Sequence, residues 1–158
     1  MDELPRAALR VAEALRAKGL EATIRQMPSS TRTAEEAAQA CGCEVGQIIK
    51  SLVFQGAVSG RPYLLLVSGK NRVNEKTVGR LIGEKLKRPD AHFVRDVTGF
   101  AIGGIPPLGH DQPMAVYLDE DLLAYGTAWG AAGTPDCVVE LDLAALSEAI
   151  GAQVTSVA

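Results

Sequence analysis

Apolar residues recur on one helix face near the start of the chain and gather into strand-length runs further along it. The pattern over Arg6–Lys18 predicts an amphipathic helix. Glu21–Met27 has the composition of a short strand. Thr33 and Glu36 have capping-box spacing, so a second helix is expected over Ala34–Cys41.

Two apolar runs in the middle of the chain predict a β-hairpin. Ile48–Gln55 and Pro62–Gly69 are rich in Ile, Leu and Val, and a turn that contains Gly and Ser separates them. Asn74 is a capping residue, and the sequence after it predicts a helix over Glu75–Leu86. Val45–Ile48 predicts one helical turn ahead of the first strand.

The second half of the chain alternates short strands with short helical segments. A Gly- and Pro-rich loop spans Thr98–Pro113, and loops of this length in compact domains are often functional. The other expected elements are a short helical or irregular segment after Pro89-Asp90, strands over Met114–Leu118, Thr127–Ala132 and Cys137–Leu141, a helical turn over Asp119–Ala124, and a helix over Leu143–Ile150 capped by Asp142.

Hairpins and crossovers therefore mix along the chain. This predicts an α/β fold of the mixed α+β kind, a single domain over residues 1–158 with a central mixed β-sheet flanked by helices. The sequence contains no phosphate-binding GxxxxGK[ST] loop and no well-placed GxGxxG, which disfavours nucleotide cofactors.

The composition is that of one globular domain. A chain of 158 residues has single-domain length, and 47% hydrophobic residues can supply a core. An aromatic content of 4% argues against a surface of rings that stack single-stranded bases. No apolar run has the length of a membrane span, and the N-terminus lacks a signal-peptide pattern.

Three cysteines and two histidines show no metal or disulfide pattern. An odd number of cysteines without a secretion signal predicts reduced thiols and a cytoplasmic location. Cys41 and Cys43 lack both the spacing and the second ligand pair of a zinc site, and His92 and His110 are far apart. We therefore expect no metal and no cofactor.

The net charge of −3 conceals a basic segment. Between Lys70 and Arg88, seven basic residues stand against two acidic ones, while the rest of the chain is acidic. The net charge disfavours a general nucleic-acid coat protein, because phosphate neutralisation dominates such binding. The basic segment has two interpretations, a solvated helix face or a patch for the end of a polyanion.

Lys50 interrupts the apolar run of the first hairpin strand. Strand alternation places it on the same face as Ile48 and Leu52, and a lysine is rarely buried without a partner. It is either an edge-strand lysine that deters aggregation or an ammonium at the mouth of a pocket, where it would hold a phosphate or carbonyl oxygen.

Two Gly-rich segments are candidates for ligand contact. In Gly103–His110, glycines permit close backbone approach while two prolines stiffen the loop. In Trp129–Asp136, small residues at a strand end leave room for a ligand beside Trp129. Each segment has a structural alternative, an ordinary turn or a tightly packed strand end. No Ser–His–Asp set or carboxylate pair stands out, so an enzyme of this sequence would rely on the substrate or a water for its base.

The order and spacing of these segments resemble the YbaK family, whose members are also called aminoacyl-tRNA deacylases or prolyl-tRNA synthetase-associated editing domains. The most specific part of the likeness is the Lys-bearing strand followed by a TGxxxGGxxPxG loop. The matching segments are Ser30–Ala38, Gln47–Phe54, Leu64–Asn74, Val97–His110 and Ala131–Leu141.

The resemblance implies a hydrolase that acts in trans, without a cofactor, on mischarged tRNA, usually tRNA(Pro). Lys50 falls on the family lysine, the catalytic candidate, which contacts the terminal nucleotide. In some members the terminal ribose hydroxyl helps to activate water. The implied substrate-binding residues are Gly103, Gly104, Ile105, Pro106, Pro107, Gly109, His110, Ala131 and Gly133. The basic segment gives the implied tRNA-binding residues, which are Lys70, Arg72, Lys76 and Arg80.

Small residues in both Gly-rich segments predict a pocket for Ala-, Cys-, Ser- or Thr-sized aminoacyl groups. Ala131–Gly133 replaces the Ser-Gly-Gly of some cysteine-specific relatives, so one hydroxyl contact is lost. The expected partners are the acceptor end of mischarged tRNA and a prolyl-tRNA synthetase, with neither membrane nor DNA. The alternative is a non-catalytic accessory protein of a tRNA synthetase that binds a nucleotide or an aminoacyl-adenylate.

Overall fold

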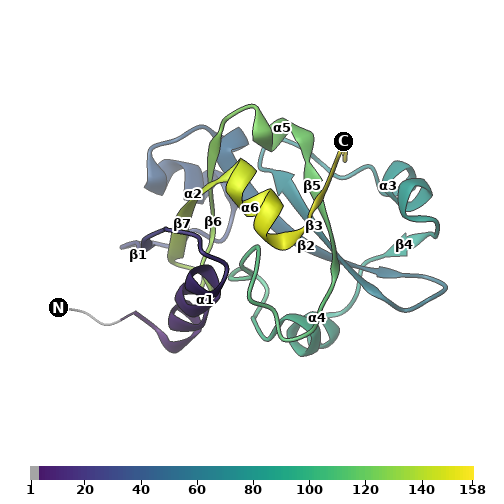
Figure 1. Ribbon diagram of the computed structural model, residues 1–158, viewed down its shortest axis with the longest axis horizontal. Helices are drawn as coiled ribbons and strands as arrows, with labels where there is room; N and C mark the ends of the chain where they lie inside the picture. The colour runs from purple at the N-terminus through teal and green to yellow at the C-terminus, as the bar shows by residue number, and fades with distance from the viewer. Residues whose placement is uncertain (1–3) are drawn as a thin grey trace.

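The computed structural model describes residues 4–158, which form helices and strands around one β-sheet (Figure 1). Residues 1–3 of the predicted domain lie outside this part. The helices are α1 (Arg6–Ala17), α2 (Ala34–Cys41), the 3₁₀ turn η1 (Val45–Gln47), α3 (Glu75–Ile82), α4 (Ala91–Thr98), α5 (Glu120–Leu123) and α6 (Leu143–Ile150). The strands are β1 (Ile24–Gln26), β2 (Ile48–Gly56), β3 (Pro62–Ser68), β4 (Leu86–Lys87), β5 (Ala115–Asp119), β6 (Thr127–Ala131), β7 (Cys137–Asp142) and β8 (Gln153–Thr155).

The sheet is mixed, as the sequence predicted. Its strand order is β1-β7-β6-β2-β3-β5-β8, with β4 paired to one end of β2. The predicted β2–β3 hairpin is antiparallel, whereas β6 runs parallel to β2, and β5 runs parallel to both β3 and β8. Within residues 4–158, no helix is long and apolar enough to cross a membrane.

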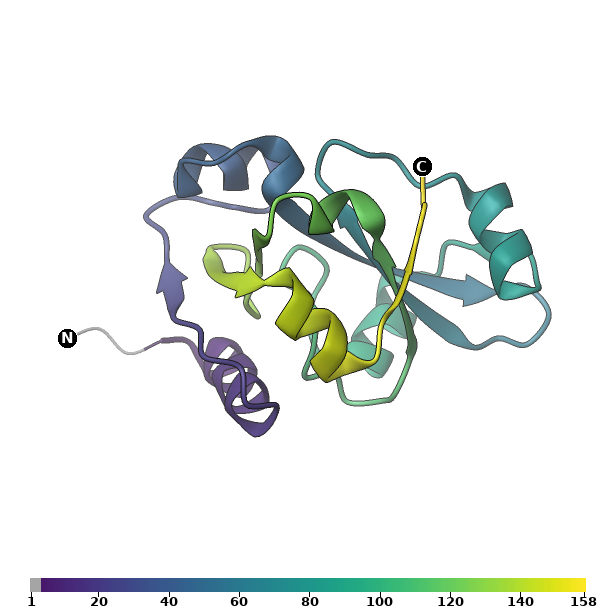
Figure 2. The ribbon, with the colours of Figure 1, turned by 45° about the horizontal axis from the view of Figure 1, so that its top comes forward.

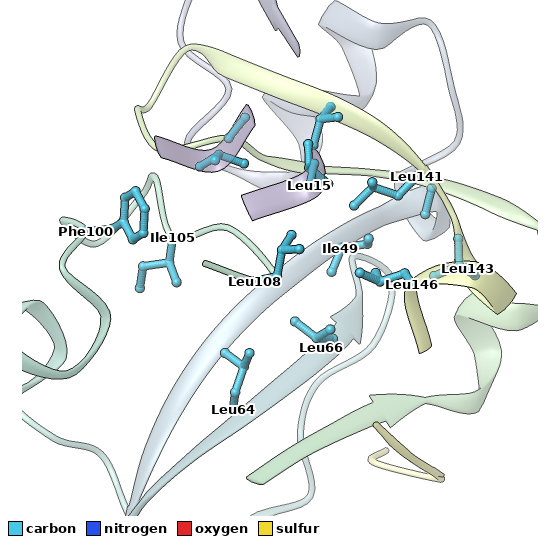
Figure 3. Packing of buried hydrophobic residues seen from close by; sticks show 14 of the residues in the cluster. Leu15, Ile49, Leu64, Leu66, Phe100, Ile105, Leu108, Leu141, Leu143 and Leu146 are labelled. Carbon is cyan, nitrogen blue, oxygen red and sulfur yellow. The ribbon is translucent and has the colours of Figure 1, made fainter. Parts of the chain in front are cut away.

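Alternating side chains build a core on each face of the sheet. On one face, Leu64 and Leu66 of β3 pack with Leu15 of α1 and Leu146 of α6 (Figure 3). The other face carries two separate clusters, one with α2 residues and one with α3 residues. Figure 2 shows α3 near one end of the molecule and α1 near the other.

The gap between the two clusters falls on β2. Ile48 belongs to the α2 cluster and Leu52 packs against the α3 cluster. Lys50 lies between them on the same face of the strand and is half-buried. The two helices therefore leave the middle of this face open where the lysine stands.

The edge of β2 that faces away from β3 is only partly paired. β6 pairs with it at Ile48 and Ile49, and β4 pairs with it at Gln55 and Gly56. No strand in the described part of the chain pairs with this edge over Lys50–Phe54. Unpaired backbone groups on a strand edge are free to bind another molecule.

Side-chain caps begin the predicted helices. Thr33, Asn74 and Asp142 each accept a hydrogen bond from a backbone N–H in the first turn of α2, α3 and α6, at 3.1, 3.1 and 2.9 Å. The Thr33 cap is the predicted capping box with Glu36. These caps confirm the predicted starts of the three helices.

The predicted end of α3 was wrong. Gly83 adopts a left-handed conformation with φ 105° and ends the helix at Ile82, and the chain returns as β4 with Leu86 buried. Val78, Ile82 and Leu86 keep one apolar period, so the pattern continues past the helix end. Strand β8 was not predicted, because three residues are too few to show an alternation.

Glu84 ties the hairpin tip to the turn between α3 and β4. Its carboxylate accepts hydrogen bonds from the Ser59 hydroxyl at 2.6 Å, the Tyr63 hydroxyl at 2.6 Å, and the backbone N–H groups of Ser59 and Val58 at 2.9 and 3.0 Å. These bonds, first that from the Ser59 hydroxyl, lower the pKa of Glu84 to about 2. The hydrogen bonds to Glu84 hold the end of α3 beside the β2–β3 hairpin.

Candidate active site

A cavity of about 280 Å³ lies where the open edge of β2 faces the loop between α4 and β5. Four predicted site residues from three distant segments line it together: Lys50, Gly103, Ile105 and Ala131. The full lining consists of residues 31–34, Ala37, residues 48–52, Ile102, Gly103, Ile105, residues 129–131 and Val138. Most of these side chains are apolar.

Lys50 reaches from the middle of β2 into this space. Its Nζ donates a hydrogen bond to the backbone carbonyl oxygen of Asn71, in the loop after β3. Burial lowers the pKa of Lys50, and the positive charge of Arg72 lowers it further, whereas Glu35 of α2 and Asp119 of β5 raise it. Lys50 is therefore held by a hydrogen bond and partly desolvated, and it still lines the cavity.

A side chain would be strained at Gly103 by its left-handed backbone and at Gly104 by contact with a neighbouring backbone segment. Gly103 has φ 99°, and a Cβ there would lie 3.1 Å from Nε of Arg32. The carbonyl oxygen of Gly104 accepts a hydrogen bond from the N–H of Gly133 at 2.9 Å. A Cβ on Gly104 would lie 2.8 Å from the Gly133 carbonyl oxygen. The contact between Gly104 and Gly133 joins the loop to the turn between β6 and β7.

Other predicted substrate-binding residues lie outside the cavity lining: Gly104, Pro106, Pro107, Gly109, His110 and Gly133. Nε2 of His110 donates a hydrogen bond to the Pro106 carbonyl oxygen at 2.7 Å, and burial lowers the pKa of this histidine. Leu108, between them, belongs to the same core cluster as Ile49 (Figure 3). These residues support the loop, and their direct contact with a substrate stays a prediction.

Arg10 of α1 binds the loop between α4 and β5, and it was not identified from the sequence as a functional residue. Its guanidinium donates hydrogen bonds to the Gly99 carbonyl oxygen at 3.0 Å and to the Asp111 carboxylate at 2.8 Å. It also stacks over the Phe100 ring, with 4.5 Å from Cζ to the ring centroid. No local pattern marks Arg10, because all its partners come from the middle of the chain.

A second cavity of about 670 Å³ shares Lys50–Leu52 with the first. Arg72 and Arg88 line it, and Arg88 pairs with Glu75 at 3.3 Å. Of the predicted tRNA-binding residues, Arg72 alone lines this cavity. The space beside Lys50 therefore continues into a basic groove.

The remaining predicted tRNA-binding residues line neither of these two cavities. Lys76 and Arg80 are exposed on α3. Lys70 lies against Tyr125, with Nζ 3.4 Å from the hydroxyl and 5.3 Å from the ring centroid. The basic segment thus divides into a part beside the cavities and a part on the outer surface.

The polar groups of the smaller cavity are hydroxyls and cations. Among the described residues that line it, none carries a carboxylate or an imidazole. Nor do three or more His, Cys, Asp or Glu side chains cluster to hold a metal ion anywhere in residues 4–158. This lining can bind and polarise a ligand oxygen, but it offers no evident side-chain general base.

Ser51 is a further polar group that the sequence did not mark. Its Oγ is buried and has no hydrogen-bond partner among residues 4–158, and the residue lines both cavities. An unsatisfied buried hydroxyl costs about 1–3 kcal/mol. The hydroxyl has almost no accessible surface, so a hydrogen bond with a bound ligand requires its side chain to rotate toward a cavity.

Comparison with known proteins assigns the chain to a class. The family of aminoacyl-tRNA editing domains matches residues 28–149, a range that contains β2, the loop and the whole lining of the smaller cavity. The chain therefore belongs to the aminoacyl-tRNA editing domain family. This confirms the family that the sequence resembled.

Individual relatives are similar to this chain over most of its length. A solved structure described as a "putative trans-editing enzyme for prolyl tRNA synthetase" is 49% identical, with a TM-score of 0.90 over 98% of each chain. The uncharacterized protein YwhH of Bacillus subtilis is 30% identical over 128 residues, 81% of each chain. The "Putative Cys-tRNA(Pro)/Cys-tRNA(Cys) deacylase EbsC" of Enterococcus faecalis is 29% identical over 112 residues, 69% of this chain and 66% of EbsC.

Replacing Ser51 with alanine tests whether its hydroxyl serves a ligand. We expect Ser51→Ala to unfold at the same temperature as the wild type or slightly higher, because an unsatisfied hydroxyl is removed. Cleavage of an aminoacyl-tRNA ester should fall by up to about tenfold, the value of one hydrogen bond. Thermal unfolding and kcat/KM measure the two effects, with the exposed Ser156→Ala as control. A lower unfolding temperature with unchanged cleavage would show that the hydroxyl is structural.

Proposed function

We propose that the protein hydrolyses, in trans, the ester of tRNA(Pro) that carries a small non-cognate amino acid such as Ala, Cys, Ser or Thr. The observation that carries this proposal is the meeting of Lys50 and the Gly103 loop at one apolar cavity of about 280 Å³. Its further support is the solved structure described as a "putative trans-editing enzyme for prolyl tRNA synthetase", which covers 98% of this chain.

The cavity walls favour a short, apolar aminoacyl side chain. Ile48, Trp129 and Val138 form one side of the lining, and Ile102 and Ile105 come from the loop opposite. The Ala131–Gly133 segment offers no side-chain hydroxyl for the thiol of a cysteinyl group. Within the proposed group of small side chains, we therefore expect alanine to be preferred.

The reaction that fits this lining is ester hydrolysis driven by positioning. A water adds to the ester carbonyl carbon, the bond from that carbon to the ribose oxygen breaks, and the tRNA leaves with a free terminal hydroxyl. The Lys50 ammonium holds an oxygen of the terminal nucleotide. As the family resemblance implies for some members, the adjacent ribose hydroxyl of the substrate helps to activate the water, and a lining without an acid or an imidazole among the described residues fits this role. Accurate placement of the reactants lowers the barrier.

The open edge of β2 supplies further contacts. Backbone groups alternate in direction along a strand, so part of those over Lys50–Phe54 point away from β3. They can bind the amino group and carbonyl oxygen of the ester. The acceptor end then continues into the groove beside Arg72 and Arg88. With tRNA as substrate and a prolyl-tRNA synthetase as partner, the protein acts in the cytoplasm.

Deacylation of purified mischarged tRNAs tests this function directly. The wild-type protein should release alanine from Ala-tRNA(Pro), and Lys50→Met should lower kcat/KM by about 10- to 100-fold, because a hydrogen bond to a charged group is worth about 1.5–3 kcal/mol. Methionine keeps the buried stem of the side chain, so the variant should fold. Lys18→Met, on the exposed end of α1, is the matched control.

Two results would contradict the assignment. A folded Lys50→Met with wild-type activity would remove Lys50 from the mechanism. Tight binding of mischarged tRNA without cleavage by the wild type would support the non-catalytic accessory alternative.

Substrate size should control the rate. With alanine and phenylalanine esterified to the same tRNA, we expect faster cleavage of the alanyl ester, because the cavity of about 280 Å³ must hold the ester group and the aminoacyl side chain together. Ile102→Ala should narrow the difference, since this loop side chain lines the cavity and is 57% exposed. Leu81→Ala, 45% exposed on α3, is the control. Faster cleavage of the phenylalanyl ester by the wild type would overturn the proposed selectivity.

The outer basic residues should contact tRNA phosphates. Lys76→Glu with Arg80→Glu should weaken tRNA binding and flatten its salt dependence, by a log–log slope of roughly 0.7–0.9 per lost phosphate contact. Cleavage of an aminoacylated terminal adenosine should not change, because this fragment does not extend to α3. A double reversal on α1, Arg6→Glu with Lys18→Glu, is the control. Equal losses on tRNA and fragment would indicate damage to the fold, and no loss on either would leave the helix face merely solvated.

A further inference from the structure

Asn71 connects Lys50 to two carboxylates. The Asn71 backbone carbonyl oxygen accepts the hydrogen bond from the Lys50 ammonium. The Asn71 side-chain amide donates to Oδ2 of Asp119 and to Oδ2 of Asp121, each at 2.8 Å. An amide group has two N–H donors, and here both are used. Asn71, which accepts the lysine hydrogen bond, is thus itself fixed by the hydrogen bonds of its side chain to the two aspartates.

Asp119 is the buried end of this connection. It is 1% exposed, and its carboxylate also accepts the backbone N–H of Ser68 at 3.0 Å and of Asp121 at 3.0 Å. A buried carboxylate is costly unless it is fully hydrogen-bonded. Its three donors come from the end of β3, the loop after β3 and the start of α5 directly after β5. They meet because β3 and β5 are parallel neighbours and finish at the same edge of the sheet.

We propose that Asp119 and Asp121 act through Asn71 as positioning residues that fix the Lys50 ammonium at the junction of the two cavities. The inference rests on the proposed function for the task that Lys50 performs, but the geometry of the connection is independent of it. Without the connection, the four-carbon stem of Lys50 would let its charge sample both cavities, and the loop after β3 would lose its anchor.

The chemistry at position 71 is specific to asparagine. Aspartate at this position would place a third carboxylate next to Asp119 and Asp121. Alanine would remove the amide that donates to both of them. The charged groups that face Lys50 are Glu35 from α2, Arg72 from the same loop and Asp119 from β5. Asp119 also bonds to Asn71, the residue that accepts the lysine hydrogen bond, whereas no such bond joins Glu35 to Asn71 among the described residues.

The first experiment measures the reactivity of Lys50, and it requires no enzymatic activity. Acetylation of each lysine by N-hydroxysuccinimidyl acetate at neutral pH is followed by peptide mass spectrometry in Asn71→Ala and Asp119→Asn. Lys50 should react about tenfold faster in both variants, because the loop loses its anchor and no longer holds the backbone carbonyl oxygen of residue 71 against the charged lysine. In Asp119→Asn, loss of the negative charge also lowers the Lys50 pKa and increases the neutral amine.

A matched control lies in the same loop. Asn74→Ala removes the cap of α3 but does not touch Lys50 or Asp119, so it should lower the unfolding temperature and leave Lys50 reactivity unchanged. The other lysines serve as internal references. Unchanged Lys50 reactivity in folded Asn71→Ala would overturn the proposal, and this variant decides the question if Asp119→Asn fails to fold.

The second experiment asks whether these residues act through the lysine. Asn71→Ala should lower kcat/KM for Ala-tRNA(Pro) in the wild-type background and add little in the Lys50→Met background. Additive losses would mean that Asn71 acts independently of Lys50 and would contradict the proposal. If the wild-type protein cleaves no mischarged tRNA, the proposed function fails, and the reactivity measurement still decides whether the connection positions Lys50.

Discussion

The interrupted pairing of β2 is the constraint on which the site depends. Only the ends of one strand edge are paired, with β6 at one end and β4 at the other. Between them, over Lys50–Phe54, the sheet opens and the loop after α4 stands across the gap. Continuous pairing would have filled this space with another strand. The cavity is therefore a property of the topology, and side chains only shape it.

Lys50 meets two demands at this place. It stands on an unpaired edge, where a charged side chain discourages the addition of a foreign strand. It also stands between the α2 and α3 clusters, where its ammonium reaches ligand-sized space. The two interpretations of this residue from the sequence are compatible, because the open edge is what makes the cavity accessible.

Sequence patterns predicted the elements and the most unusual residues. Lys50 in an apolar strand and Gly103 in a Gly- and Pro-rich loop carry local signals, and both line the cavity. Arg10, Ser51 and Asn71 carry none, because their roles depend on partners brought close by the sheet. An apolar period that continues through Gly83 likewise disguised the end of α3. Local patterns specify elements, whereas register and topology specify which polar groups meet.

The two sides of the cavity come from distant parts of the chain. β2 and β3 form a local hairpin, and Asn71 follows it directly. The partner strand β6 and the turn that carries Gly133 come from the last third of the sequence. Local hairpins form early in folding, and distant parallel pairs form late because loop closure opposes them. During synthesis, the hairpin that bears Lys50 can therefore form long before the cavity exists, and the cavity is complete only once the C-terminal strands have left the ribosome.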